Sequence, residues 1–114
     1  MSKQIMIVDD SSIMRKMVRN LLEKKGYQIA AEARNGREAI DMYDQHRPEL
    51  VIMDVTMRDM DGFSAAREIM TLDSGARIVF FSNLDKEQYS GRAAEVGALG
   101  FVNKHNLDQL LELI

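Results

Sequence analysis

Carboxylates follow two apolar runs of the sequence, each at the point where the run ends. Asp9 and Asp10 come directly after the apolar residues 5–8, and Asp54 comes directly after residues 50–53. Uninterrupted apolar runs of this length are typical of strands that are covered on both faces of a parallel sheet. Because open α/β folds bind ligands at the edge where their strands end, we expect the three carboxylates to lie close together there.

Two further residues with useful side chains fall at the same predicted edge. Ser82 directly follows a third apolar run, residues 78–81, and its hydroxyl can donate a hydrogen bond to a ligand oxygen. Lys104 follows a short apolar stretch, residues 99–102, and its long side chain can reach the same edge. The sequence therefore predicts carboxylates, a hydroxyl and a cation at one end of one sheet.

This group of side chains favours phosphoryl chemistry with a metal ion. Carboxylates held close together repel one another and raise one another's pKa unless a cation compensates. A hard divalent cation such as Mg²⁺ fits oxygen ligands and often also binds a phosphate oxygen. Asp54 is then either a metal ligand or a nucleophile toward phosphorus, because carboxylates form aspartyl phosphates. Such a phosphate adds about two negative charges, which Lys104 can compensate.

Each residue taken alone also has a purely structural interpretation. Asp10 and Ser11 are good helix caps, Asp54 could cap a turn, and Ser82 belongs to a residue type that favours turns. The functional interpretation is favoured because the carboxylates occur together with Lys104 in one predicted cluster.

The elements that must position this cluster alternate along the chain. Strands are expected at residues 4–8, 28–33, 50–53, 78–81 and 99–102, each followed by a helix with apolar residues at helical spacing. In the first helix we expect the following residues to face inward: Ile13, Met14, Met17, Val18, Leu21 and Leu22. Crossovers of this length require parallel pairing. We therefore predict an α/β fold, an open doubly wound five-stranded parallel sheet with five helices on both faces, and the polar-flanked strand 28–33 at an edge.

Composition narrows the class of protein. The 114 residues, 46% of them hydrophobic, fit a single domain over residues 1–114. The absence of cysteine excludes disulfides and thiolate chemistry, and a net charge of −3 gives no indication of nucleic-acid binding. Neither a signal peptide nor an apolar run of membrane-spanning length is present, so we expect a cytoplasmic protein without membrane contact. Glycine-rich nucleotide motifs are missing, and His46 and His105 lack the spacing of paired metal ligands.

Asp9-Asp10, Asp54, Ser82 and Lys104, in this order at strand ends, resemble the active site of the receiver domain of two-component response regulators, of the CheY-like kind. The resemblance covers nearly the whole chain. It is supported by these local matches: residues 8–11 (VDDS), 35–39 (NGREA), 54–57 (DVTM), 60–62 (MDG) and 97–104 (GALGFVNK). The resemblance also implies the flavodoxin-like strand order 2-1-3-4-5.

The resemblance implies a role for each site residue. Asp54 would accept a phosphoryl group from a histidine kinase or a small phosphodonor. Asp10, Asp54 and the main-chain carbonyl of Thr56 would hold Mg²⁺, with Asp9 helping through water. Lys104 would bind the phosphoryl oxygens. The chain would then be a signalling domain, whose own catalysis is limited to slow self-phosphorylation from small donors and autodephosphorylation.

The resemblance also implies a conformational switch. Ser82 would move toward the phosphoryl group, and Phe101 would move inward into the space that Ser82 vacates. The surface that changes is formed by the last two βα units and is called the Phe101 face below. A protein target, or an output domain fused after Ile114, would bind that face, and no direct binding of nucleic acid is expected. Burial statistics also allow Phe101 to be an ordinary core residue.

Three positions depart from the usual receiver sequence. Arg58 stands where receivers usually have Pro, and we expect it to pair with Asp59 or Asp61 at the surface or, less simply, with the phosphoryl group. His105 follows Lys104 in place of a Pro that is often cis, so we expect a trans bond and a different loop. Phe101 replaces the common Tyr and has no hydroxyl.

Two alternative functions remain open. Because Arg58 and His105 replace the usual prolines, one alternative is a pseudo-receiver, a binding module that does not depend on phosphorylation. A metal-dependent phosphatase of the haloacid dehalogenase type fits less well, because such enzymes carry a second Asp where this chain has Thr56. The apolar pattern of the last helix still runs at Ile114, so a cut from a longer regulator also stays open.

Overall fold

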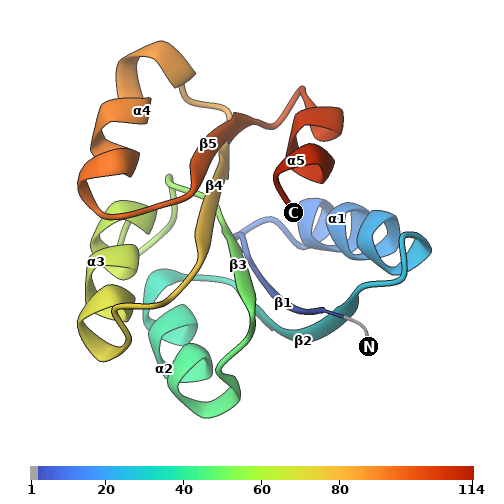
Figure 1. The fold of residues 1–114 in the computed structure, drawn as a ribbon, viewed down its shortest axis with the longest axis horizontal. Helices are drawn as coiled ribbons and strands as arrows, with labels where there is room; N and C mark the ends of the chain where they lie inside the picture. Colours follow the sequence, from blue (N-terminus) through green and yellow to red (C-terminus); the bar gives the residue numbers. More distant parts are fainter. Residues whose placement is uncertain (1–2) are drawn as a thin grey trace.

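Five parallel strands form one sheet between two layers of helices in the computed structural model, which describes residues 3–114 (Figure 1). The strands are β1 (Gln4–Val8), β2 (Gln28–Ala33), β3 (Leu50–Met53), β4 (Ile78–Ser82) and β5 (Gly100–Asn103). Their order is β2-β1-β3-β4-β5, and every neighbouring pair is parallel. This confirms the predicted fold class, the strand order and the edge position of β2. The predicted start of β5 is wrong by one residue, because its pairing with β4 begins at Gly100.

A helix follows every strand. The helices are α1 (Ser12–Lys24), α2 (Gly36–His46), α3 (Gly62–Leu72), α4 (Lys86–Glu95) and α5 (Leu107–Leu113). A side chain just before each helix accepts a hydrogen bond from a main-chain N–H group of the first turn. These caps are Ser11, Asn35, Asp61, Asp85 and Asn106. In the part of the chain that the structure describes, no helix is long and apolar enough to cross a membrane.

The sheet separates two hydrophobic cores. Helices α1 and α5 cover one face, and helices α2, α3 and α4 cover the other (Figure 1). Successive side chains of a strand point to opposite faces, so Ile7 packs under α1 and α5 while Met6 packs on the other side. Both faces of the central strands are therefore apolar, as the uninterrupted runs predicted, and the polar residues of these segments occur at the strand ends.

Two residues of α1 do not face inward as expected. Ile13 is 82% exposed and Met17 is 41% exposed. Successive helical residues are separated by 100°, so the face that contains Met14, Val18 and Leu22 leaves Ile13 and Met17 to one side. The predicted apolar stripe was therefore too wide, and its outer part reaches the solvent next to the start of the helix.

Candidate functional site

The predicted carboxylates lie together at the carboxyl edge of the sheet. Asp9 follows β1 and Asp54 follows β3, and these two strands are neighbours in the sheet. One carboxylate oxygen from each of Asp9, Asp10 and Asp54 lies within 4.8 Å of the other two. Asp9 and Asp54 are only 3% and 6% exposed, whereas Asp10 is exposed. The ends of adjacent strands therefore bring the three side chains into one partly buried acidic cluster.

Lys104 reaches into this cluster from the end of β5. Its Nζ lies 2.7 Å from Oδ2 of Asp9 and 3.0 Å from Oδ2 of Asp54, and its side chain is only 8% exposed. Burial alone lowers the pKa of Lys104, but the two carboxylates outweigh it and raise the pKa above its ordinary value. Burial raises the pKa of Asp54, although Lys104 opposes this. The ammonium group is therefore held as a charged bridge between two buried carboxylates.

Main-chain N–H groups bind the other oxygen of each buried carboxylate. Oδ1 of Asp9 accepts a hydrogen bond from the N–H of Ser11 at 2.9 Å. Oδ1 of Asp54 accepts one from the N–H of Val55 at 2.8 Å. Each carboxylate is thus oriented by the backbone through Oδ1 and turned toward Lys104 through Oδ2.

Gly62 connects the start of α3 to the end of β3. Its N–H donates to the carbonyl of Val55 at 2.7 Å, and a Cβ atom at this position would lie 2.1 Å from the carbonyl oxygen of Asp54. No side chain fits this approach, so the glycine allows the helix to pack directly on the backbone that carries Asp54.

A cavity of about 330 Å³ opens above the acidic cluster. It is lined by the carboxylates and Lys104 together with Ser11, Thr56, Ser82, Asn83 and Leu84. Ser82 is buried, and its Oγ accepts a hydrogen bond from the N–H of Leu84 at 3.1 Å, which leaves the hydroxyl proton for another acceptor. All the residues predicted for phosphoryl and metal chemistry therefore border one small cavity.

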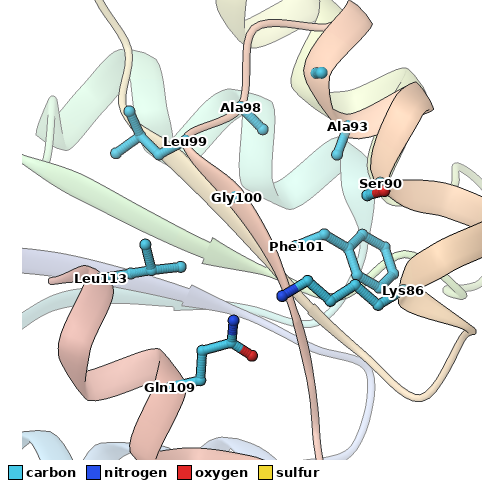
Figure 2. Close-up of a pocket in the computed structure, with 10 residues that line it drawn as sticks. Lys86, Ser90, Ala93, Ala98, Leu99, Gly100, Phe101, Gln109 and Leu113 are labelled. Carbon is cyan, nitrogen blue, oxygen red and sulfur yellow. The ribbon is translucent and has the colours of Figure 1, made fainter.

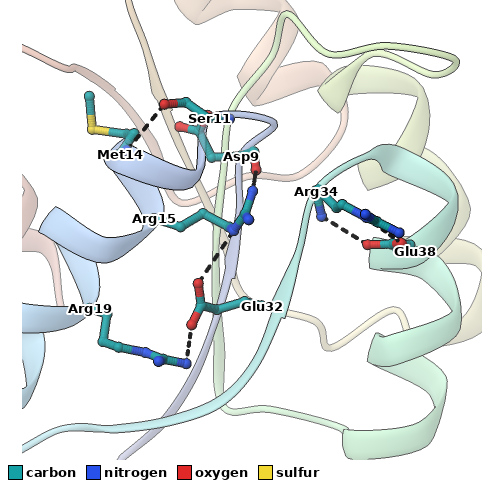
Figure 3. A network of polar contacts seen from close by, with 8 residues as sticks. All are labelled: Asp9, Ser11, Met14, Arg15, Arg19, Glu32, Arg34 and Glu38. Carbon is teal, nitrogen blue, oxygen red and sulfur yellow. Dashed lines mark hydrogen bonds and ion pairs between the residues drawn. The ribbon is translucent and has the colours of Figure 1, made fainter.

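Arg15 supports the site from α1 and was not singled out by the sequence. Its Nη1 donates to the main-chain carbonyl of Asp9 at 2.6 Å, and its Nε lies 3.3 Å from Glu32 of β2 (Figure 3). Arg19, one turn further along α1, also pairs with Glu32. One feature of the sequence could have indicated this contact. Glu32 is an acidic residue in an apolar strand segment, and the preceding helix has two arginines four residues apart.

Comparisons with known proteins agree with this geometry. The family model described as response regulator receiver domain matches residues 5–114, nearly the whole chain. The chain belongs to the response regulator receiver family.

The relatives of this receiver include chemotaxis proteins. CheY of Bacillus subtilis is 41% identical over 115 residues, which covers 100% of this chain and 96% of that protein. CheY of Thermotoga maritima is 40% identical over 104 residues, or 91% of this chain and 87% of that protein. The crystal structure of a CheX–CheY–BeF3–Mg complex from Borrelia burgdorferi contains a chain with a TM-score of 0.90 and 30% identity, covering 97% of this chain and 88% of that one. The receiver is thus CheY-like, a signalling domain of two-component systems.

The Phe101 face of the receiver contains a shallow groove. Phe101 is buried, and its ring centroid lies 6.4 Å from that of Phe80. Beside it, a cavity of about 320 Å³ runs between α4 and α5, with Ser90 and Ala93 on one side and Leu113 on the other (Figure 2). The ring of Phe101 is already buried in the core in this structure. The inward movement of Phe101 that the resemblance implies therefore stays a prediction.

The predictions for Arg58 and His105, the two residues that replace the usual prolines, have different outcomes. The Lys104–His105 peptide bond is trans, as predicted. The expected surface pairing of Arg58 is wrong: no ion pair within residues 3–114 includes it. Arg58 instead lines a cavity of about 320 Å³ together with Asp10 and Arg34. Asp59, which lines the same cavity, has a positive φ of 69°. Arg58 therefore shares a cavity with Asp10, the exposed member of the acidic cluster.

Proposed function

We propose that this receiver is a switch controlled by phosphorylation of Asp54. The observation that carries the proposal is the buried carboxylate of Asp54, bridged by Lys104 to Asp9 at the floor of a cavity that opens to the solvent. Burial raises the pKa of Asp54 because the carboxylate is removed from water, whereas the contact with Lys104 favours the ionised form that can act as a nucleophile.

The proposed cofactor is Mg²⁺. Oxygen atoms of Asp9, Asp10 and Asp54 lie within 4.8 Å of one another, a donor set that suits a hard divalent cation. We assign Asp10, Asp54 and the main-chain carbonyl of Thr56 as ligands, with Asp9 acting through water. When bound, the ion supplies positive charge that compensates both the carboxylates and the phosphoryl oxygens.

Phosphoryl transfer requires few groups beyond Asp54. A carboxylate oxygen of Asp54 forms a bond to phosphorus while the bond from phosphorus to the donor breaks. The electron pair of that bond stays on the donor, on a histidine nitrogen of a kinase or on the acyl oxygen of a small phosphodonor. Lys104 then exchanges its contact with Oδ2 of Asp54 for a phosphoryl oxygen, and the hydroxyl of Ser82 donates to another.

Phosphorylation of Asp54 would change the conformation of the Phe101 face. A new charge at Asp54 favours the packing in which Ser82 turns toward the phosphoryl group, and this shifts the population of conformations around Phe101. In the Borrelia complex a CheY binds the protein CheX. By analogy, we infer that a protein target or output domain binds the Phe101 face here, that a histidine kinase supplies the phosphoryl group, and that both act in the cytoplasm.

Intact-mass measurement tests the proposal directly. The protein is incubated with acetyl phosphate and Mg²⁺, beside a metal-free sample, Asp54→Asn and the matched surface variant Asp59→Asn. We expect one phosphoryl adduct that requires both Mg²⁺ and Asp54 and that persists in Asp59→Asn. If the wild type gives no adduct and also fails to bind beryllofluoride, the receiver is a pseudo-receiver.

A further inference from the structure

We propose that Asn103 is a positioning residue that fixes Lys104 in the site, in place of the proline that usually follows this lysine in receivers. Oδ1 of Asn103 accepts a hydrogen bond from the N–H of His105 at 2.8 Å. Its main-chain carbonyl accepts another from Asn106 at 2.8 Å. Two bonds from one residue therefore close the turn that contains Lys104.

The backbone of Lys104 is also held from the sheet side. Its N–H donates to the carbonyl of Ser82 at 2.9 Å, directly after the last paired residues of β4 and β5, Ser82 and Asn103. Lys104 thus has the sheet on one side and the Asn103 turn on the other. A lysine side chain is long and flexible, so a fixed backbone position matters for an ammonium group that must reach two carboxylates.

Asn103 and His105 are chemically complementary. A proline after Lys104 would fix its own φ and would carry no N–H group. His105 is exposed and has an N–H group, which donates to the Asn103 side chain and not only to water. An asparagine two residues earlier supplies that acceptor and closes an Asx turn. The pair therefore replaces a covalent restraint with a hydrogen bond.

A structural alternative predicts different behaviour. Asn103 would then only stabilise the chain before α5, as Asn106 does when its Oδ1 accepts the N–H of Gln109 at 3.1 Å. Asn106→Ala is therefore a matched control, because it removes an asparagine hydrogen bond from the same loop and leaves the bond to His105 in place. The consequence for phosphoryl binding rests on the proposed function, whereas the placement of Lys104 does not.

The first experiment measures the placement of Lys104 without metal or phosphoryl group. Reductive methylation followed by peptide mass spectrometry gives the modification rate of Lys104 in the folded protein. We expect Asn103→Ala to raise this rate at least tenfold, while Asn106→Ala stays within twofold of wild type and Asn103→Asp restores protection. Equal protection in Asn103→Ala, or an equal loss in Asn106→Ala, would overturn the proposal.

The second experiment tests whether Asn103 acts through Lys104. Beryllofluoride affinity with Mg²⁺ is measured for Asn103→Ala, Lys104→Ala and the double variant. We expect Asn103→Ala to weaken binding about tenfold in the wild-type background and to have no further effect when Lys104 is absent. Additive losses would show that Asn103 acts independently of Lys104. If wild type itself does not bind beryllofluoride, the proposed function fails, and the methylation rates still decide the role of Asn103.

Discussion

At the scale of single residues, Lys104 is the cation that compensates the buried carboxylates of the site. It lies within 3.0 Å of two carboxylates that are themselves buried. A buried carboxylate without a partner is costly, and here two would face each other without the ammonium group. The divalent cation proposed for this site would therefore compensate the same negative charge as Lys104.

Replacing Lys104 with alanine tests this shared role. We expect Lys104→Ala to lower the free energy of unfolding by about 3 kcal/mol without metal, as for other broken buried ion pairs. Mg²⁺ should raise the free energy of unfolding more in Lys104→Ala than in wild type, because the variant has no ammonium group to compensate the two carboxylates. Urea denaturation with and without Mg²⁺ measures both effects, with the exposed Lys16→Ala as control. Equal stabilisation of both proteins by Mg²⁺ would contradict the shared role.

Tyr43 gives the receiver a pH dependence far from the acidic site. Burial, and next its hydrogen bond of 2.7 Å to Asp73, raise the pKa of its phenol to about 12. An unfolded tyrosine loses its proton near pH 10, so the folded state holds the proton more tightly. The contribution of protonated Tyr43 to the free energy of unfolding is therefore complete below about pH 10. It should be lost as the pH rises toward about 12.

Phenylalanine at position 43 removes this titration. In Tyr43→Phe we expect the free energy of unfolding to decline less steeply above about pH 10. At neutral pH we expect a loss of about 1 kcal/mol, because the hydrogen bond to Asp73 is missing. Denaturation at several alkaline pH values, together with tyrosinate absorbance, checks both. An unchanged alkaline decline in Tyr43→Phe would refute the assignment.

The residues that sequence reasoning found and missed differ in how they are positioned. Asp9 and Asp54 could be predicted because each directly follows a strand, Asp10 because it is the next residue after Asp9, and strand ends meet at one edge. Arg15 could not, because its bond to the carbonyl of Asp9 depends on how α1 crosses the sheet. The surroundings of Arg58 depend on the turn at Asp59, whose positive φ no residue type predicts reliably.

At the scale of elements, α1 and α4 show how far periodicity can be trusted. The spacing of α1 predicted the helix and its cap but overstated its buried face, because neighbouring apolar residues 13 and 14 cannot both point at the sheet. In α4 only Ala93 is buried, and the helix is otherwise held by partly exposed contacts, such as those of Tyr89 and Arg92 with the ring of Phe63. Both helices that line the groove of the Phe101 face therefore have a single buried residue, Ala93 in α4 and Leu110 in α5.

Gly91 offers a direct way to stabilise α4. It lies inside the helix, and a Cβ atom there would have no neighbour within 4 Å. We expect Gly91→Ala to raise the free energy of unfolding by about 0.5–1 kcal/mol, since glycine is the poorer helix former. Gly62→Ala should do the opposite, because its Cβ would lie 2.1 Å from the carbonyl oxygen of Asp54. Thermal denaturation compares the two, and destabilisation by Gly91→Ala would mean that α4 packs differently.

At the scale of the whole molecule, helices that cover the same face of the sheet differ in how many of their residues are buried. Five residues of α3 are buried, against one of α4 on the same face. Strand order came from the family resemblance, since periodicity alone gives five strands and parallel crossovers without saying which strands are neighbours. The layers themselves follow from the apolar runs and the crossover rule.

Hydrogen exchange tests this unequal packing. We expect main-chain amides of α4 to exchange faster than those of α3, and those of the central strands β1, β3 and β4 to exchange slowest, because local opening follows the number of buried contacts. Peptide mass spectrometry after exchange in D₂O measures all of them in one series. Gly91→Ala serves as control and should slow exchange in α4 alone. Protection of α4 equal to that of α3 would contradict the packing described here.

The order in which the site residues occur along the chain also matters during synthesis. Asp9 is made early, Asp54 near the middle and Lys104 close to the end of the described sequence, yet they meet in one contact. A nascent chain that lacks Lys104 has two carboxylates with no ammonium group between them and lacks β5 beside β4. Domains generally fold as units once enough of the chain is available. The complete site of Asp9, Asp54 and Lys104 therefore forms only when all five strands have been assembled, and the phosphoryl acceptance proposed for Asp54 would depend on that assembly.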